Sequence, residues 1–337
     1  MRTPISLSVA LIALVAGQAA AQEVNVYSSR HYNTDQALYD EFTAATGIKV
    51  NLIEAKGDAL IERMTAESES SPADVFITVD GSRISRAVEA GLFQPISSDA
   101  LTEAVPENLR HPDGLWFGLS TRVRGIVYAK DKVDPSEITS YEDLTDEAWK
   151  GRICIRSSSN VYNQSLVASM IATNGLEAAE GWANGIVTNM ARDPQGGDTD
   201  QIKAVAAGEC DVAVSNHYYL ARLISSDDAA DQAVAEAVGI IFPNQNDRGS
   251  HANVSAAGVA AHAPNKDAAV QFIEYLATPS AQAYFAEGNH EWPVVADVKL
   301  SPVLETWGEF KTDAVDVIEY GANNAEALKA MDRAGWQ

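Results

Sequence analysis

Five side chains on three separate segments of the chain carry oxygen or nitrogen atoms that could bind a metal ion. They are His31 and Tyr32 near the start, Tyr162 in the middle, and the adjacent pair Tyr218 and Tyr219. A free phenol has a pKa of about 10 and loses its proton at neutral pH only to a strongly polarising cation. Deprotonated phenol oxygens are hard donors, which select hard metals. Zinc or copper would more naturally draw cysteine and histidine, and calcium or magnesium a run of carboxylates, so this set indicates ferric iron.

A single tyrosine has a simpler interpretation. The chain has 11 tyrosines, and a half-buried tyrosine usually packs with its hydroxyl hydrogen-bonded. The adjacent pair is different, because neighbours on a strand point to opposite faces and reach one centre only from a loop or a helix N-terminus. Residues 210–214 read as a buried strand and residues 220–224 as the start of a helix. The pair is therefore expected in a strand-to-helix turn, where α/β sheets bind ligands.

Residues 1–21 fit a secretory signal peptide. Arg2 precedes an apolar stretch from Leu7 to Val15, and three alanines at 19–21 precede Gln22, as a signal-peptide cleavage site requires. The apolar part is too short to span a bilayer, and no later stretch reaches about 18 apolar residues. The mature chain is expected to be soluble, exported to a periplasm and, with no cysteine after the alanines, free of a lipid anchor.

Charge and length restrict the class of protein. The chain has 47 acidic and 24 basic residues, a net charge of -23, which argues against nucleic-acid or anionic-membrane partners. The excess of acid is compatible with binding cations, although it also simply favours solubility. A mature chain of about 315 residues exceeds what one core usually supports, so two lobes are expected.

The first part of the chain alternates strands and helices, which predicts a parallel doubly wound sheet. Strands are expected at residues 24–27, 48–52 and 74–78, and helices at residues 35–45, 57–68 and 82–89.

A second α/β series begins at residues 152–155, after an extended crossing segment at residues 122–129. Residues 239–243 and 255–260 are expected to return the chain to the first lobe. The predicted boundaries are residues 22–121 and 245–295 for the first lobe, and residues 122–244 and 296–337 for the second.

Two cysteines occur, Cys154 and Cys210, each at the start of an apolar run. An even pair in an oxidising compartment predicts a disulfide between neighbouring strands. The alternative is two unpaired thiols buried near each other.

Five segments of the chain resemble the periplasmic ferric-iron-binding proteins of ABC importers, most of all the subclass with a His-Tyr pair near the N-terminus. The segments are residues 27–32, 73–76, 156–163, 215–222 and 291–294, in family order. The resemblance implies a type II periplasmic-binding-protein fold, in which two α/β lobes, each a doubly wound sheet, are joined by crossing hinge strands. It also implies that the four tyrosines named above are phenolate ligands, whereas His31 either ligates the metal or stands beside it.

Arg122 and Arg222 match positions where the resembling subclass places guanidinium groups near the phenolates. Charge gives an independent reason for them. Four phenolates around a trivalent cation leave one excess negative charge, which an always-protonated guanidinium can compensate. For Arg122 the alternative is an ordinary salt bridge on the surface of a lobe.

The predicted function is capture of ferric iron between two closing lobes and delivery to an ABC permease with its ATPase subunit. Fe(III) is then the transported ligand, with carbonate or another anion as a possible further ligand, and the protein is a monomer. The alternative is a small organic or phosphorylated anion bound on the same fold without metal. The chain has no G-x-x-x-x-G-K-[ST], G-x-S-x-G or H-E-x-x-H motif, so neither ATP binding nor catalysis is expected.

Overall fold

The computed structural model of this protein describes residues 22–30 and 32–337. The predicted signal peptide at residues 1–21 and the predicted ligand His31 lie outside these residues and stay predictions. Within the described ranges, no helix combines the length and the apolar character needed to cross a membrane.

The first lobe contains three parallel strands in the order β2-β1-β3. They are β1 (Glu23–Ser28), β2 (Lys49–Glu54) and β3 (Val75–Val79), each followed by a helix: α1 (Asn33–Thr46), α2 (Gly57–Glu67) and α3 (Gly81–Glu89). Helix α1 ends at Gly47, whose φ of 75° lets its N–H return to the carbonyl of Thr43. The expected alternation of strands and helices is confirmed here.

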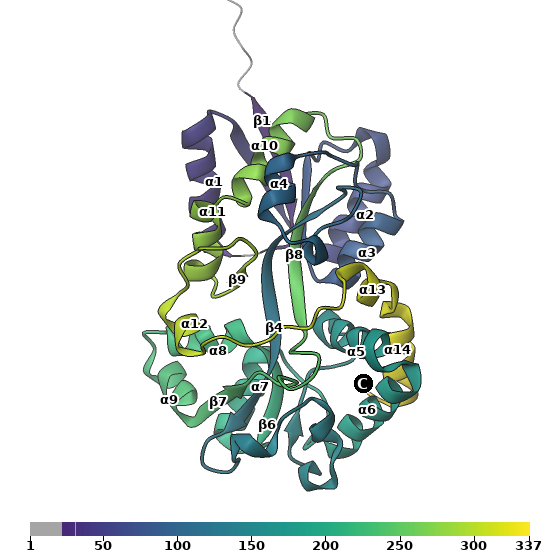
Figure 1. The fold of residues 1–337 in the computed structure, drawn as a ribbon, viewed down its shortest axis with the longest axis vertical. Coiled ribbons are helices and arrows are strands. Elements are labelled where there is room, and N and C mark those ends of the chain that lie inside the picture. Colours follow the sequence, from purple (N-terminus) through teal and green to yellow (C-terminus); the bar gives the residue numbers. More distant parts are fainter. Residues whose placement is uncertain (1–21, 31) are drawn as a thin grey trace, which may run out of the picture.

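Two long strands connect the lobes. Strand β4 (Phe117–Ala129) pairs with β8 (Ala252–Val259) through its first half and with second-lobe strands through its second half. Figure 1 shows β4 running from the upper lobe into the lower one. The three strands β1, β2 and β3 are parallel as predicted, and β8 adds an antiparallel strand beside β3. The short β9 (Trp292–Pro293) also pairs with β4.

The second lobe is built on strands β5 (Ile153–Cys154), β6 (Val212–Asn216) and β7 (Val238–Ile241). Its helices are α5 (Val161–Asn174), α6 (Leu176–Asn189), α7 (Asp198–Ala207), α8 (His217–Ile224) and α9 (Ala229–Ala237). Strand β7 pairs with the second-lobe half of β4. Residues 238–241 therefore pair within the second lobe, and β8 returns the chain to the first lobe.

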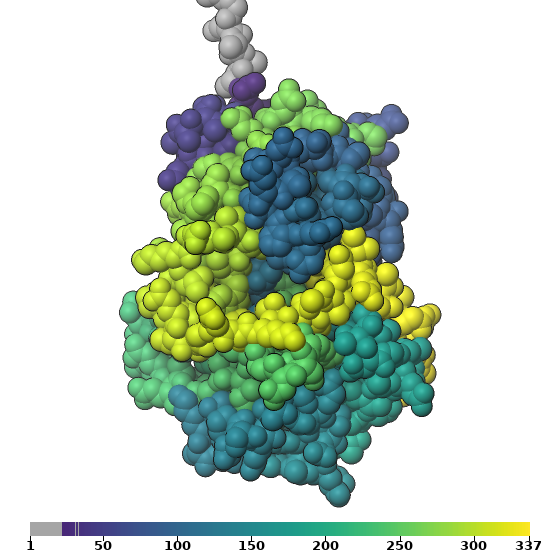
Figure 2. All heavy atoms as spheres, viewed as in Figure 1, coloured from purple at the N-terminus to yellow at the C-terminus, as the bar shows by residue number. Residues whose placement is uncertain are grey.

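The remaining helices cover the outside of the sheets and the join between the lobes. They are α4 (Asp99–Ala104), α10 (Lys266–Leu276), α11 (Pro279–Ala283), the π-helical turn Tyr284–Gly288, α12 (Pro302–Thr306), α13 (Val317–Ala322) and α14 (Asn324–Arg333). The segment from β9 to α13 crosses one face of the molecule between the lobes (Figure 2), and α14 packs on α5 and α6. The predicted lobe boundaries stay a prediction.

Apolar clusters fill both lobes, and the cluster of the second lobe extends to Ile84 of α3 and Val254 of β8. In the first lobe Phe42 of α1 and Phe272 of α10 pack edge to face with ring centroids 5.0 Å apart, beside the strands. In the second lobe Leu166 of α5 and Trp182 of α6 lie in one buried cluster with Val214 of β6. Burial of such side chains is the dominant favourable contribution to folding. These clusters therefore stabilise the strands and helices of each lobe.

A disulfide joins Cys154 of β5 to Cys210, two residues before the paired strand β6. The prediction from the sequence is confirmed, and the alternative of two unpaired thiols is wrong.

We expect Ellman titration of the unreduced, denatured protein to detect no free thiol. The two cysteines are separated by 56 positions, and the chain-entropy model assigns a loop of that size about 4 kcal/mol of stabilisation. Reduction should therefore lower the free energy of unfolding by about that amount. Two titratable thiols without reductant would contradict the disulfide.

Candidate metal centre

The adjacent tyrosines lie in the first turn of a helix. Helix α8 begins at His217, directly after β6 ends at Asn216, so Tyr218 and Tyr219 are its second and third residues. Their rings stack with centroids 4.2 Å apart. Tyr218 is buried and Tyr219 is partly exposed. The pair thus follows the strand as expected, without an intervening loop.

Tyr32 and Tyr162 also lie at helix N-termini. Tyr32 directly precedes α1, and Tyr162 is the second residue of α5, whose cap Asn160 accepts the backbone N–H of Tyr162 at 3.2 Å. All four tyrosines therefore lie at the positive end of a helix dipole, where negative charge is favoured.

Arg222 shows that the lobes bring the tyrosines together. Its guanidinium carbon lies 4.8 Å from the ring centroid of Tyr32, 4.9 Å from that of Tyr218 and 5.9 Å from that of Tyr219. Tyr32 belongs to the first lobe and the pair to the second. Negative charge on Tyr162 would raise the pKa of Tyr32, Tyr218 and Tyr219, which places Tyr162 near the other three. All the described tyrosines of the predicted set thus meet in one cluster between the lobes.

Burial keeps the phenols of Tyr32, Tyr218 and Tyr219 neutral until a cation arrives. Burial raises the pKa of Tyr32, Tyr218 and Tyr219, and negative charge on the neighbouring tyrosines would raise the pKa of Tyr218 and Tyr219 further. Such phenols ionise at neutral pH only when a strong positive charge replaces the proton.

Arg122 is buried at 1% exposure rather than placed on the lobe surface. Its Nη2 donates to the Ser255 hydroxyl at 2.8 Å, and its Nε lies 3.9 Å from Oε1 of Glu291. In the described part of the chain, its Nε and Nη1 find no hydrogen-bond acceptor. Negative charge on Tyr32, Tyr162 or Tyr218 would raise the pKa of Arg122, although burial opposes that rise. The salt-bridge alternative on the surface is thus wrong, and Arg122 keeps free donors beside the tyrosines.

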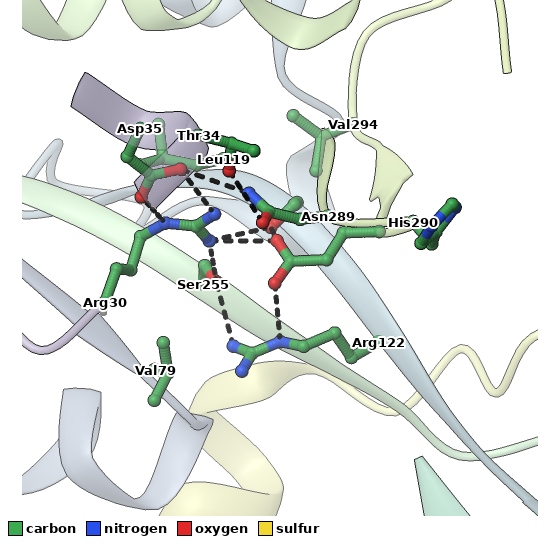
Figure 3. A network of polar contacts seen from close by, with 12 residues as sticks. Arg30, Thr34, Asp35, Val79, Leu119, Arg122, Ser255, Asn289, His290 and Val294 are labelled. Carbon is green, nitrogen blue, oxygen red and sulfur yellow. Dashed lines mark hydrogen bonds and ion pairs between the residues drawn. The ribbon is translucent and has the colours of Figure 1, made fainter. Parts of the chain in front are cut away.

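A buried polar network supports the first-lobe side of the cluster (Figure 3). Arg30 donates from Nε to Asp35 at 2.8 Å and from Nη1 to Glu291 at 2.9 Å, and its guanidinium carbon lies 4.8 Å from the Tyr32 ring centroid. Burial alone would raise the pKa of Glu291, but the charges of Arg30 and Arg122 lower it to about 2. Glu291 is therefore an anion between two cations.

A second arginine pair borders Tyr162. The guanidinium carbons of Arg124 and Arg156 lie 5.9 and 5.8 Å from its ring centroid, and both arginines pair with the buried carboxylate of Asp198. Sequence reasoning assigned no role to these three residues or to Arg30 and Glu291. The signal that could have found them is that Arg30, Arg156 and Glu291 lie inside the segments that carry the resemblance.

His217, next to the tyrosine pair, is a neutral structural link. Its Nδ1 accepts the backbone N–H of Val123 at 3.1 Å, and its Nε2 donates to the carbonyl of His290 at 2.7 Å. Burial lowers its pKa to about 4. Across residues 22–30 and 32–337, no group of three or more histidines, cysteines, aspartates or glutamates is arranged to hold a metal.

Comparison with known proteins finds similar chains along almost the whole length. The family described as "Bacterial extracellular solute-binding protein" matches residues 37–312. "Iron uptake protein A1" of Synechocystis is 54% identical over 316 residues, which are 94% of this chain and 88% of that protein. "Major ferric iron-binding protein" of Neisseria meningitidis serogroup B is 30% identical over 346 residues, 99% of each chain.

Solved structures are similar to this chain over the same length. The structure of Trichodesmium IdiA (FutA) in complex with iron and citrate ligands superposes with a TM-score of 0.91 at 59% sequence identity, covering 94% of this chain and all of that one. The two-lobed type II fold expected from the sequence is confirmed.

Proposed function

We propose that this chain, which belongs to the bacterial extracellular solute-binding proteins and among them to the ferric-iron-binding proteins, captures ferric iron through Tyr32, Tyr162, Tyr218 and Tyr219. The observation that carries the proposal is that Tyr32 of the first lobe and Tyr218 and Tyr219 of the second meet around Arg222. Tyr162 joins them through its electrostatic effect on all three. Phenolate oxygens are hard donors suited to a hard trivalent cation. The iron would be clamped between the lobes, as ligands of hinged binding proteins are.

The surrounding arginines supply the charge that such a site needs. Four phenolates and one ferric ion carry one excess negative charge. Arg222 lies over tyrosine rings of both lobes, so its guanidinium charge is available to balance the excess. Arg122 shares Glu291 with Arg30 and adds its free donors. The free donors on Arg122 also suit a small anion such as carbonate or citrate beside the metal. His31 remains a proposed ligand of the same ion.

The alternative ligand, a small organic or phosphorylated anion without metal, would use the same two arginines. The geometry favours iron, because the Arg222 guanidinium faces three tyrosine rings. Tyrosines gathered from both lobes offer hard oxygen donors to a trivalent cation, whereas a carboxylate or phosphate would be bound by the guanidinium groups themselves.

The proposed route follows from the family. Residues 1–21 direct the chain to the periplasm, where the mature protein binds iron as a monomer and carries it to an ABC permease with an ATPase subunit. Delivery requires no chemical reaction, so the protein acts as a carrier and not as an enzyme.

Purified protein loaded with ferric iron is expected to turn red-orange, because phenolate-to-iron charge transfer absorbs visible light. The measurement is an absorption spectrum during titration with ferric iron, followed by competition with a chelator. Titration with a phosphonate under the same conditions is the control. A colourless protein whose thermal midpoint rises with phosphonate and not with iron would favour the alternative.

A further inference from the structure

Asp198 is a fully buried carboxylate at the start of α7, in the second lobe. Its Oδ1 pairs with Arg124 Nη1 and accepts the backbone N–H of Asn216 at 3.0 Å, and its Oδ2 accepts Arg156 Nη1 at 2.6 Å. A buried charge persists only when it is paired and hydrogen-bonded. Both carboxylate oxygens of Asp198 thus accept hydrogen bonds from groups that lie next to the tyrosines.

The two arginines connect Asp198 to Tyr162. Both guanidinium carbons lie just under 6 Å from its ring centroid. Arg124 Nη2 also donates to Asn163 Oδ1 at 2.5 Å, and Asn163 Nδ2 donates to the carbonyl of Arg156 at 2.9 Å. Asn163 directly follows Tyr162, so these bonds fix the first turn of α5 as well as the surroundings of the ring.

The backbone bond connects Asp198 to the tyrosine pair. Asn216 is the last residue of β6 and the cap of α8, and Tyr218 and Tyr219 follow within its first turn. The Asn216 side chain accepts from Arg124 Nη1 at 3.2 Å. The side chain of Asn216 is thus hydrogen-bonded to Arg124 and its backbone N–H to Asp198. These two bonds fix the residue at which α8 begins.

We propose that Asp198 is the positioning residue of the second lobe, which holds Tyr162, Tyr218 and Tyr219 in the arrangement that binds ferric iron. The inference rests on the proposed function and deepens it. Asp198 acts through Arg124, Arg156 and the cap of α8. Two arginines against one carboxylate also leave one positive charge beside Tyr162, on the side where phenolate charge develops when the metal binds.

The test is Asp198→Asn in the mature chain. Asparagine keeps the size and can still accept the Asn216 N–H, but it loses the charge that holds both arginines. We expect iron affinity about 100-fold weaker, at the upper end for residues that support metal ligands, together with a shifted phenolate-to-iron absorption band. The shifted band is the decisive readout, because a purely structural ion pair would change stability and leave the spectrum of bound iron unaltered.

Asp211→Asn is the matched control. Asp211 also lies in the second lobe and accepts from two basic groups, Arg152 at 2.7 Å and Lys132 at 3.1 Å. Neither basic group lies over a tyrosine of the cluster, so affinity and band should stay as in the wild type. Arg156→Gln decides the matter if Asp198→Asn does not fold, because Arg156 is partly exposed and its loss frees one side of Tyr162. We expect about tenfold weaker affinity and a shifted band.

Wild-type affinity and band in Asp198→Asn, or in Arg156→Gln where only that variant folds, would overturn the inference and leave the proposed function standing. A wild-type protein that shows no charge-transfer band with iron would overturn the proposed function and the inference with it.

Discussion

Replacing Tyr218 or Tyr219 by phenylalanine is expected to weaken ferric-iron binding about 100-fold and to change the thermal midpoint of the metal-free protein little. The substitution removes one oxygen and keeps the ring. The two rings stack on each other, with centroids 4.2 Å apart, and pack beside Arg222, so packing at the start of α8 survives. What is lost is one of the proposed phenolate bonds.

The magnitude follows from typical metal sites. Structural zinc sites with four protein ligands bind with about 10–16 kcal/mol, which is about 3 kcal/mol per ligand, and that corresponds to about 100-fold in affinity. The measurement is chelator competition on each variant, together with the thermal midpoint without metal.

Tyr275→Phe provides the control. Tyr275 lies on α10 in the first lobe, and its hydroxyl donates to Glu41 at 3.1 Å. Loss of that hydroxyl should leave iron affinity unchanged. Unchanged affinity with a collapsed midpoint in the Tyr218 and Tyr219 variants would instead mean that these hydroxyls serve the fold.

The tyrosine pair and the disulfide could be placed from the sequence because their signals are local. The apolar run before Tyr218 predicted a buried strand, and the run after Tyr219 predicted a helix. The pair was therefore expected at the junction between them. Cys154 and Cys210 each begin an apolar run, and adjacent strands bring them together. In each case a few neighbouring residues decide the outcome.

The carboxylates that support the tyrosines could not be found in this way. Glu291 pairs with Arg30 across 261 positions, and Asp198 with Arg124 across 74. A lone charged residue in a sequence is usually exposed, and nothing near Glu291 or Asp198 in the chain indicates burial. These pairings arise only when distant segments fold together.

The pairing of the later strands could not be predicted for a related reason. Residues 239–243 are an apolar run that would suit either lobe, and pairing partners depend on tertiary packing more than on the strand's own residues. The structure places β7 beside the second-lobe half of β4. The mixed first-lobe sheet arises because β8 enters antiparallel beside β3, which alternation of strands and helices in the first 90 residues cannot reveal.

Both lobes place buried ion pairs beside tyrosines, with two carboxylates for Arg30 and Arg122 in the first lobe and one for Arg124 and Arg156 in the second. In the first lobe Glu291 holds Arg30 beneath the Tyr32 ring, and in the second Asp198 holds Arg124 and Arg156 beside Tyr162. Each carboxylate is paired with guanidinium groups that also lie close to a tyrosine ring. Asp198 balances only one of its two arginines, so the second lobe keeps one positive charge beside Tyr162, which iron-bound phenolates would offset.

Iron affinity is expected to fall steeply as the pH falls. Burial raises the pKa of Tyr32, Tyr218 and Tyr219 above the ordinary value, so these phenols carry their protons in the metal-free protein at neutral pH. Each must lose its proton to bind, and the affinity should therefore drop up to about tenfold per pH unit for every proton displaced. His31 would add to this dependence in the mildly acidic range if it ligates, since a free imidazole has a pKa of about 6.5.

The measurement is chelator competition from mildly acidic to neutral pH, on the wild type and on His31→Gln, with proton release recorded during iron loading. His31→Gln should flatten the curve between about pH 5 and 7 and still bind iron at neutral pH, because glutamine has no proton to lose in that range. Parallel curves would mean that His31 stands beside the metal without binding it. Affinity that does not change with pH in either protein, with no protons released, would contradict phenolate ligation, because neutral phenols cannot become ligands of this kind without giving up their protons to the solvent.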